Sequence, residues 1–331
     1  MDIIKKLTNC TVVSTVKQED DEAAWLEART HGIGGSDIGA ICGVSPFSSA
    51  RQIYLKKTGQ YEDAVETSEA AKQRMHFGHL LEPVVADEYS RRTGDKLKEV
   101  DATFAHKQYP WALANVDRLI VDEDDNPIGI LECKTTGEYM NEEWESGEIL
   151  LSYMYQLQWY LWILGLEKGA IACLVGGNKF YYYEVFRNDA LINDTLLPAG
   201  QHFWFENVRK LVEPEMQQTD TDFANGLYQD VEKNSEITLE SDIDNELAET
   251  VFTCKAKIKE LTKTMEEAQN RLKDRLKTAE IGYCKDYTVK WSPRAQKRVD
   301  TDLLKTEFPD VYNRVLKVVQ YRAMSVKGVK V

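Results

Sequence analysis

The stretch GILECKTT, residues 129–136, constrains the fold of this chain more than any other segment. Its apolar and β-branched residues predict a strand, in which successive side chains point to opposite faces of a sheet. Glu132 and Lys134 then share one face with Ile130, whereas Leu131 points the other way. Burying a charge is unfavourable unless the charge is paired or bound to a metal. The stretch is therefore either the exposed end of a strand or a strand whose charges have a function.

The neighbouring segments predict a mixed α/β core. Strands are expected at 110–122 and 127–135, joined by the acidic turn DEDDN, and in GAIACLVGG and KFYYYEVFRN, joined at a Gly-Gly-Asn turn. Helices are expected on both sides of a glycine-rich turn within 21–60, and at 69–92, 152–164 and 189–212. This order of elements favours a central mixed β-sheet flanked by helices.

Three carboxylates fall where a hairpin and a helix would bring them together. Asp117 lies in the strand pattern ALANVDRLIV, so a hairpin about the acidic turn brings it to the same end of the same face as Glu132 and Lys134. Glu82 interrupts an apolar stripe on the helix at 69–92. That stripe, which should pack on the sheet, is formed by Met75, Gly78, Val85 and Tyr89. A divalent cation that prefers oxygen ligands, such as Mg²⁺, relieves the repulsion between such carboxylates.

Each of these residues also has a purely structural interpretation. Glu-x-Lys pairs commonly form solvated strand edges, and Asp117 alone would be explained as a turn cap. Glu82 alone would be explained by an ion pair with Arg74 or Lys72, and Pro83 predicts that the helix kinks or restarts there. The convergence of four groups is what favours a catalytic interpretation.

The chain resembles the PD-(D/E)XK nucleases, and more closely the lambda-exonuclease and YqaJ-type phage recombination nucleases. The residues that carry this resemblance are Gly78-x-x-x-Glu82, Asp117, Glu132-Cys133-Lys134, YMYQLQWYLWILG at 153–165, and WLEARTHGIGGSDIGAICGVSPF at 25–47. In that family an arginine is followed seven positions later by a serine, as Arg29 and Ser36 are here. The resemblance spans roughly residues 21–210 and implies a restriction-endonuclease-like core.

By position, the resemblance implies a site for Mg²⁺, for which Mn²⁺ can substitute. The metal would be held by Asp117, Glu132 and the backbone carbonyl of Cys133, with Glu82 holding or positioning it from the helix. Lys134 would serve the attacking water, and Gln156 would also belong to the catalytic site.

The resemblance also implies that Arg29, Ser36 and Gln156 contact the terminal 5′-phosphate of DNA. Asn115 stands two positions before Asp117, where lambda-exonuclease has a serine at the phosphate site. Local sequence leaves alternatives open: Ser36 as an ordinary helix N-cap, Arg29 as a surface partner of Glu27 or Glu22, and Gln156 as a satisfied polar group in a core helix.

The function implied is a Mg²⁺-dependent, processive 5′→3′ exonuclease acting on double-stranded DNA ends. It would leave 3′ single strands for a single-strand annealing protein in phage-type homologous recombination, and would form a ring-shaped homotrimer around the DNA. Two alternatives are kept: a structure-specific or restriction-like endonuclease of the same fold, and a non-catalytic DNA-binding or coiled-coil scaffold.

Charge and cysteine usage are compatible with this expectation. The net charge is −14, but residues 284–331 hold eleven Lys and Arg against five Asp and Glu, a net +6, which leaves −20 on the rest. Basic groups lining one groove can still bind DNA, because the local field matters more than the total charge.

The six cysteines are scattered without a Cys-x-x-Cys pair, which argues against zinc and iron–sulfur sites. No signal peptide or membrane span is expected, so a cytoplasmic location, in a bacterial host if phage-encoded, is predicted.

Three regions are expected along the chain: a nuclease core at 1–213, an acidic linker at 214–244 and a C-terminal extension at 245–331. The extension begins with a heptad pattern from Leu247 to Leu276 that predicts a long helix with one narrow apolar seam, as in a coiled coil. A strand or hairpin at 281–291 and a basic helical tail follow. We expect this extension to enlarge the ring or to contact DNA or the annealing partner.

Overall fold

The computed structural model describes residues 3–16, 20–60, 69–228, 232, 235–317 and 322–328. The chain divides into two units, Met1–Leu227 and Tyr228–Val331, and each is described here by itself. Lys330, which belongs to the expected basic tail, lies outside the described residues.

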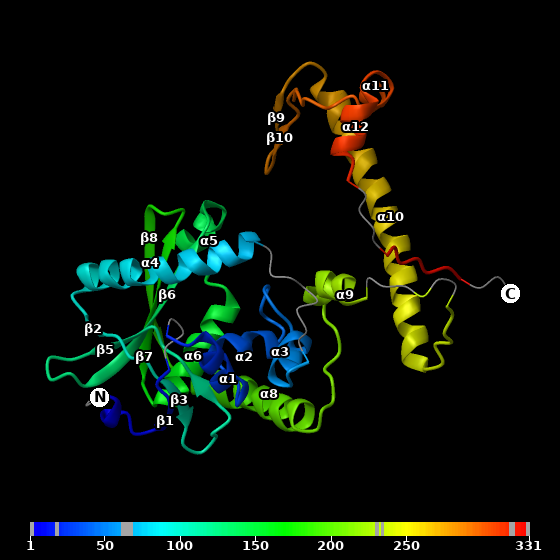
Figure 1. The fold of residues 1–331 in the computed structure, drawn as a ribbon. Helices are drawn as coiled ribbons and strands as arrows, with labels where there is room; N and C mark the ends of the chain where they lie inside the picture. Colours follow the sequence, from blue (N-terminus) through cyan, green and yellow to red (C-terminus); the bar gives the residue numbers. More distant parts are fainter. Residues whose placement is uncertain are drawn as a thin grey trace. The chain divides into compact units, whose positions relative to one another are not determined.

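The first unit is built on a five-stranded mixed sheet with the order β2-β5-β6-β7-β8 (Figure 1). Its strands are β2 (Lys96–Lys98), β5 (Arg118–Val121), β6 (Pro127–Thr136), β7 (Lys168–Val175) and β8 (Lys179–Phe186). Only the β6–β7 pair is parallel; the other three pairs are antiparallel. The acidic turn therefore closes a β5–β6 hairpin as predicted, and the Gly-Gly-Asn turn joins β7 to β8.

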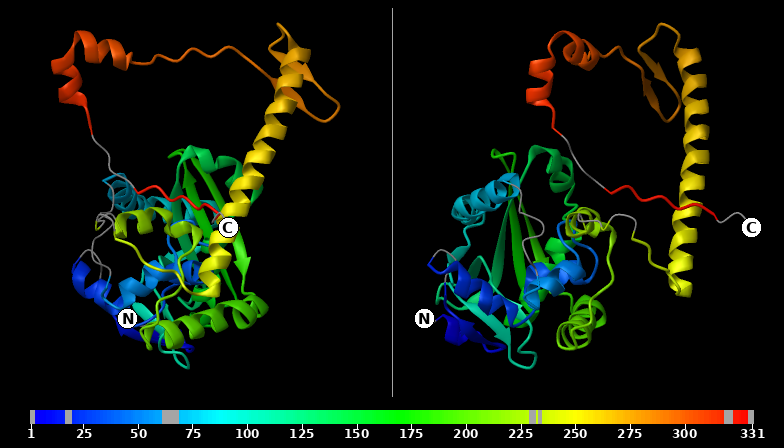
Figure 2. Two further views of the ribbon diagram at one scale, coloured as in Figure 1. Left: turned by 90° about the vertical axis from the view of Figure 1, so that its right-hand side faces the viewer. Right: turned by 45° about the vertical axis from the view of Figure 1, so that its right-hand side comes forward.

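Helices cover both faces of this sheet. On one face α4 (Glu69–Thr93) packs Val85, Ala86 and Tyr89 against Leu131, and Figure 2, right, shows α4 in cyan on one side of the green strands. On the other face α6 (Leu151–Leu164) packs Leu157 and Leu161 into the larger core that contains Ile130. Between β6 and α6 lie η2 (Glu138–Met140) and α5 (Asn141–Ser146). Neighbouring residues of β6 thus enter different cores, as the period of two requires.

The expected strand at 110–122 is divided in two. Leu113–Ala114 forms β4 of a second sheet, whose order is β1 (Cys10–Ser14), β3 (Thr103–His106), β4. Residues 115–117 cross from this sheet to β5, and Asp117 comes directly before the first paired residue of β5, Arg118. The crossing places Asn115 and Asp117 in a connection between two sheets.

The N-terminal helices and the last helical run complete this unit. They are η1 (Ile4–Lys6), α1 (Glu22–Thr30), α2 (Gly35–Ile41), α3 (Ala50–Lys57), α7 (Asp189–Leu191), η3 (Ile192–Leu196), α8 (Leu197–His202), η4 (Phe203–Val208), η5 (Gln218–Asp220) and α9 (Thr221–Leu227). From α7 to η4 the helical turns are continuous, with π-helical geometry in η3 and η4.

Of the two outcomes expected at Pro83, a kink or a restart, the restart is wrong, and the expected apolar stripe of this helix is only partly buried. The helix runs through Pro83 as one element of 25 residues, without a restart. Its apolar stripe is buried only in the second half: Val85 and Tyr89 are buried, but Met75 is 58% exposed. The hydrophobic cluster beneath α4 contains Val85, Ala86 and Tyr89 from its second half and no described residue from its first half, which leaves Met75 outside the cluster.

The boundary of the first unit lies further along the chain than the expected linker. Asp220 is buried and accepts hydrogen bonds from Ser49 (2.5 Å) and Gln52 (3.0 Å), and Phe223 is buried as well. Arg51 donates to the carbonyl of Pro214 (3.0 Å). Residues 214–227 are therefore part of the folded first unit, because their polar and aromatic side chains complete its packing around α3.

The second unit is dominated by α10 (Asp242–Leu276), the 35-residue helix that the heptad pattern predicts. A hairpin of β9 (Ile281–Tyr283) and β10 (Thr288–Lys290) follows, and then α11 (Thr301–Glu307) and α12 (Pro309–Val315). Across the described ranges, no helix combines the length and the apolar character that a membrane span requires.

Candidate active site

The second half of β6 carries the two charged side chains singled out by the sequence. Lys134 Nζ lies 2.6 Å from Glu132 Oε1, and the Glu132 side chain is almost fully buried. Both side chains reach Gln156 of α6, so they lie on the face of the sheet that α6 covers. The prediction that Glu132 and Lys134 share one face is confirmed, and the alternative of a solvated strand edge is wrong for Glu132.

Gln156 joins these two charges to α6. Its Nε2 donates to Glu132 Oε1 (2.6 Å) and to Tyr160 Oη (3.3 Å), and its Oε1 accepts from Lys134 Nζ (3.3 Å). An aromatic and otherwise apolar helix thus presents one buried amide to the charged pair. Gln156 is therefore a satisfied polar group of a core helix, as the structural alternative expects, and its partners are the two charged residues of the strand.

The second carboxylate oxygen of Glu132 is the most informative atom of the site. Oε2 is buried and has no hydrogen-bond partner among the described residues. An unpaired carboxylate oxygen in a buried place is costly, and a native structure normally satisfies it. An oxygen-binding cation beside Oε2 would do so.

Asp117 supplies a second carboxylate to the same place. Its Oδ2 accepts a hydrogen bond from the backbone N–H of Cys133 (2.7 Å). Arg118 pairs with Leu131 in the hairpin, so the same register places Asp117 opposite Glu132. Burial and the nearby charge of Glu132 raise the pKa of Asp117 to about 7, although Lys134, the Cys133 N–H and Arg118 act in the opposite direction. The two carboxylates therefore repel each other in a site that water solvates poorly.

Glu82 has a partner that the sequence did not indicate. Arg118 Nη1 lies 2.6 Å from Glu82 Oε1 and also donates to the backbone carbonyl of Asp117 (2.5 Å). Burial, followed by the charge of Asp117, raises the pKa of Glu82, while Arg118 opposes the rise. The expected structural alternatives, Arg74 and Lys72, are not this partner. The only signal for Arg118 was its place after Asp117 at the start of a strand.

The donor set fits a hard divalent cation that retains water. Within the described ranges no cluster of three or more His, Cys, Asp or Glu side chains is arranged to hold an ion. Asp117 and Glu132 are the two carboxylates that lie together, and Mg²⁺ is commonly bound by one or two carboxylates plus waters. Burial and the charge of Asp117 raise the pKa of the Cys133 thiol, which disfavours the thiolate that zinc would select.

Lys134 remains an ammonium in this environment. Burial by itself lowers its pKa, but the charges of Glu132 and Asp117 outweigh burial and raise the pKa above its usual value. The ammonium also lies 4.9 Å from the ring centroid of Tyr153 on α6. A protonated Lys134 can orient a water and offset negative charge, whereas removing a proton from that water would require it first to lose its own.

The glycine-rich turn presents the second group of predicted residues. Gly34 is the N-cap of α2, and Ser36 is the second residue of that helix, so Ser36 is not the N-cap. Ser36 Oγ accepts a hydrogen bond from Arg29 Nη2 (2.9 Å), and the Arg29 guanidinium lies 4.5 Å from the ring centroid of Trp25. Arg29 and Ser36 thus come together, as expected, on two consecutive helices.

Two residues that hold this turn were not identified from the sequence. Asp37, buried at the third position of α2, accepts from the N–H of Gly34 (2.9 Å) and pairs with Lys57 Nζ (2.7 Å). Burial raises the pKa of Asp37, but Lys57 and Arg29 outweigh burial and lower it, so the carboxylate stays ionised. Lys57 also donates to the carbonyl of Arg29 (2.7 Å). The signal for Asp37 was its spacing of three after Gly34, which is that of a capping box.

A glycine brings the turn against α6. A Cβ at Gly35 would lie 2.4 Å from Tyr160 Cε1 and 3.0 Å from Gln156 Cγ. Only glycine permits this approach, so the turn that carries Ser36 lies directly against the side chain that binds Glu132. The Arg29–Ser36 pair and the carboxylates therefore flank the same two residues of α6.

Asn115 is hydrogen-bonded to the second sheet. Its Nδ2 donates to Thr103 Oγ1 (2.8 Å) on β3. Among the described residues, Asn115 makes no hydrogen bond to Arg29 or Ser36.

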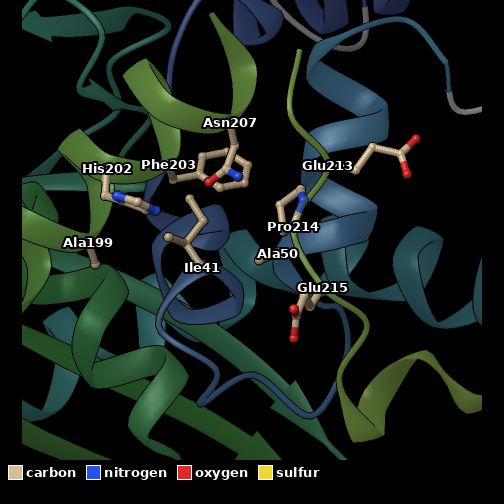
Figure 3. Close-up of a pocket in the computed structure, with 9 residues that line it drawn as sticks. All are labelled: Ile41, Ala50, Ala199, His202, Phe203, Asn207, Glu213, Pro214 and Glu215. Carbon is tan, nitrogen blue, oxygen red and sulfur yellow. The ribbon is translucent and has the colours of Figure 1, made fainter. Parts of the chain in front are cut away.

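A pocket of about 490 Å³ lies elsewhere in the first unit (Figure 3). It is lined by residues of α2, α3, α8, η4 and the segment 213–215, and includes none of the predicted site residues. The site on β6 and α6 is therefore identified by its charges and by an unsatisfied oxygen, and not by a deep cavity.

One protein-family model and several known proteins are similar to this chain. A family model described as the YqaJ-like viral recombinase domain matches residues 24–167. Uncharacterized protein YqaJ of Bacillus subtilis strain 168 is 38% identical over 309 residues, covering 92% of this chain and 94% of its own length. An alkaline exonuclease (LHK-Exo) of Laribacter hongkongensis aligns with a TM-score of 0.47 at 20% identity, over 57% of this chain and 94% of its own. A phage related exonuclease of Haemophilus somnus 129PT aligns with a TM-score of 0.37 at 13% identity, over 54% of this chain and 96% of its own.

Proposed function

Since this chain belongs to the YqaJ-like viral recombinase family, we propose that it is a divalent-metal-dependent nuclease that degrades double-stranded DNA from its ends. The proposed direction is 5′→3′, which leaves 3′ single strands for an annealing protein in phage-type recombination. Mg²⁺ is the proposed metal, with Mn²⁺ able to replace it.

The main support for this proposal is one buried carboxylate oxygen without a partner. Glu132 Oε2 is buried and without a hydrogen-bond partner among the described residues, beside Asp117, whose pKa is raised to about 7. This arrangement supports a cation ligated by both carboxylates, and we include the backbone carbonyl of Cys133 as a further ligand. When bound, the metal would polarise the scissile phosphate and acidify a water.

The protein groups have separate roles in the proposed hydrolysis. Lys134, held by Glu132 and Gln156, orients the attacking water and offsets the negative charge that accumulates as the water adds to phosphorus. The bond from phosphorus to the leaving oxygen then breaks, and by way of solvent the leaving oxygen gains a proton equivalent to the one that the attacking water loses. Glu82, paired with Arg118, positions Asp117 from α4, because Arg118 also donates to the Asp117 carbonyl.

Recognition of a DNA end is assigned to the glycine-rich turn. Arg29 and Ser36 lie together and offer hydrogen-bond donors of the kind that bind phosphate. We propose that they bind the terminal 5′-phosphate together with Gln156, and that Asn115 adds a weaker contact. A ring of three protomers around the DNA would provide the processivity that an acidic chain lacks by charge alone.

The test compares linear double-stranded DNA, labelled on either strand end, with covalently closed circular DNA in the presence of Mg²⁺. Wild-type protein is expected to release the 5′ label first and to leave the circle intact. Lys134→Ala is expected to abolish release of label, and Lys72→Ala, an exposed lysine of α4 outside the site, is the matched control that keeps it.

Each other outcome contradicts a defined part of the proposal. Cutting of the circle would show an endonuclease. First release of the 3′ label would reverse the polarity. No digestion by wild-type protein with either Mg²⁺ or Mn²⁺ would favour a non-catalytic DNA-binding protein.

A further inference from the structure

The helix α10 has an apolar seam that its own unit leaves exposed. The seam consists of Leu247, Val251, Cys254, Ile258, Leu261, Met265, Ala268 and Leu272, which alternate between the two core positions of a heptad repeat. Leu247, Ile258 and Leu261 are each more than 60% exposed, and no residue of α10 is buried. Figure 1 shows α10 in yellow as one uninterrupted helix. A helix of this length with an apolar stripe normally buries that stripe against another element.

We propose that the seam binds the same seam of a second copy of this chain, with the two helices antiparallel. A two-fold axis between Lys259 and Glu260 pairs each residue with one at an equal distance on the other side of the axis. The seam then stacks in four kinds of layer: Leu247 with Leu272, Val251 with Ala268, Cys254 with Met265, and Ile258 with Leu261. Every layer combines one residue of each heptad core position, which is the packing that an antiparallel pair requires.

The charges at the ends of the seam favour this direction. Continuing the heptad one step beyond Leu247 and beyond Leu272 reaches Asp244 and Arg275, which face each other in the antiparallel pair. Opposite charges attract at close range, and like charges at one level repel.

A parallel pair in register lacks these contacts. It would place Asp244 against Asp244 of the partner subunit and Arg275 against Arg275 of the partner subunit at the two ends of the seam. It would also stack Cys254 on Cys254 of the partner subunit. The charged residues in the first turns of α10 are all acids, namely Asp242, Asp244, Glu246 and Glu249, so a parallel pair would concentrate eight negative charges at one end. Antiparallel helices instead bring these acids toward a segment that holds three bases, Arg271, Lys273 and Arg275, against one acid, Asp274.

Cysteine cross-linking of the full chain tests the register directly. The background variant is Cys284→Ser, which removes the other exposed thiol and keeps Cys254. Adding Met265→Cys places a second thiol in the layer predicted to contain Cys254 of the partner subunit. Mild oxidation should then convert most of the chain to a disulfide-linked dimer on a non-reducing gel. Within one chain the two thiols are about 16 Å apart along the helix, too far to form a disulfide.

Three controls make the result specific. The background variant alone should stay monomeric on the gel. Glu266→Cys in the same background, one residue from the seam, should also stay monomeric. Cys254→Ser together with Met265→Cys should lose the dimer, which identifies the bonded pair. Cross-linking of the background variant through Cys254 would show parallel helices, and absence of a dimer with Met265→Cys would show that the seam does not pair with itself; either result overturns the proposal.

Charge exchange gives a second, independent measurement. Asp244→Arg places two arginines in each end layer, so the mass measured by light scattering should fall to that of the unpaired form. Asp244→Arg with Arg275→Asp exchanges the charges and should restore the mass of wild type. Failure of the double variant to recover association would contradict the predicted contact. Neither experiment uses DNA, so its outcome does not depend on the nuclease activity.

Discussion

The two oxygens of Glu132 have opposite environments. Oε1 accepts hydrogen bonds from Lys134 Nζ and Gln156 Nε2, both at 2.6 Å, and Oε2 accepts none from the described residues. Donors on one oxygen fix the orientation of the carboxylate, and the other oxygen is left for a ligand. Asp117 is oriented in a similar way, because its Oδ2 accepts a hydrogen bond from the backbone N–H of Cys133. At the residue scale the site is therefore preorganised on one side and unsatisfied on the other.

The affinity for Mn²⁺ is expected to depend on pH below about 7. A ligating carboxylate must be ionised, and the pKa of Asp117 is raised to about 7 by burial and by Glu132. Affinity measured by calorimetry should therefore fall about tenfold per pH unit below that value and be nearly constant above it. Asp117→Asn should bind weakly and should lose the part of this dependence that Asp117 contributes, while Glu132, whose pKa is also raised by burial, keeps its own part. A constant affinity of wild-type protein below pH 7 would contradict the assignment.

The same shift predicts how the stability of metal-free protein changes with pH. Between about pH 4 and about pH 7 the folded chain keeps a proton on Asp117 that the unfolded chain has released, so the free energy of unfolding falls as pH rises. Asp117→Asn removes this contribution. Urea denaturation of both proteins over this range should give a steeper loss for wild type, and parallel curves would exclude a raised pKa.

Arg118 offers a second test at the residue scale. Arg118→Met removes the partner of Glu82 and should lower the free energy of unfolding by about 1–3 kcal/mol, because a half-buried carboxylate loses a charged hydrogen bond. Glu82→Gln in that background should recover part of the loss. Arg91→Met, which removes an exposed partner of Glu88, is the control and should have a smaller effect in the same denaturation measurement.

At the scale of elements, the site depends on how closely α2 approaches α6. A glycine at position 35 lets the backbone of α2 contact Tyr160 and Gln156, and a second glycine, Gly39, lies against the backbone of Ser152. Small residues on one helix allow a close approach of another. The helical turn that carries Ser36 is thereby fixed relative to the strand that carries Glu132.

Two glycine substitutions should have opposite effects. Gly35→Ala would place Cβ 2.4 Å from Tyr160, and we expect a loss of about 1–3 kcal/mol from overpacking. Gly78→Ala has no heavy atom within 4 Å and lies inside α4, so we expect a gain of about 0.5–1 kcal/mol from helix propensity. Thermal unfolding of both variants checks the pair. A neutral Gly35→Ala would show that the contact with α6 is not tight.

At the scale of the whole molecule, the chain consists of a unit with two hydrophobic cores and a unit with an exposed helix. The first unit includes the buried side chains of Asp220 and Phe223, which lie beyond the core boundary expected at residue 213. The two α10 helices of the proposed antiparallel pair are related by a two-fold axis, whereas the three protomers of the proposed ring are related by a three-fold axis. If both assemblies form, each pair of α10 helices joins protomers of two different rings.

Two truncations test the boundary between the units. A chain of residues 1–227 should unfold cooperatively, with a melting temperature close to that of the first unit in the full chain. A chain of residues 1–213 loses the partner of Ser49 and Gln52 and the buried ring of Phe223, a loss on the order of 3 kcal/mol from the ring alone. Equal stability of the two fragments would show that residues 214–227 contribute no packing.

Local patterns in the sequence determined the elements and the identity of the charged residues. The period of two in GILECKTT predicted that Glu132 and Lys134 share a face, the acidic turn predicted the β5–β6 hairpin, and the heptads predicted α10. The family resemblance rests on the same short motifs and is confirmed by the match over residues 24–167 and by the Bacillus subtilis relative. These features depend on neighbours within a few residues, which a single sequence displays directly.

Only the tertiary structure decided which partners these residues meet. Arg118 as the partner of Glu82, Lys57 as the partner of Asp37, and Gln156 as the bridge between Glu132 and Lys134 all join residues that are 20 or more positions apart. The exposure of Met75 and the inclusion of residues 214–227 in the first unit also depend on which surfaces the sheet and α3 happen to cover. A sequence shows which faces are apolar or charged, but the partner of each face is set by chain topology and by the competition among all such faces for burial.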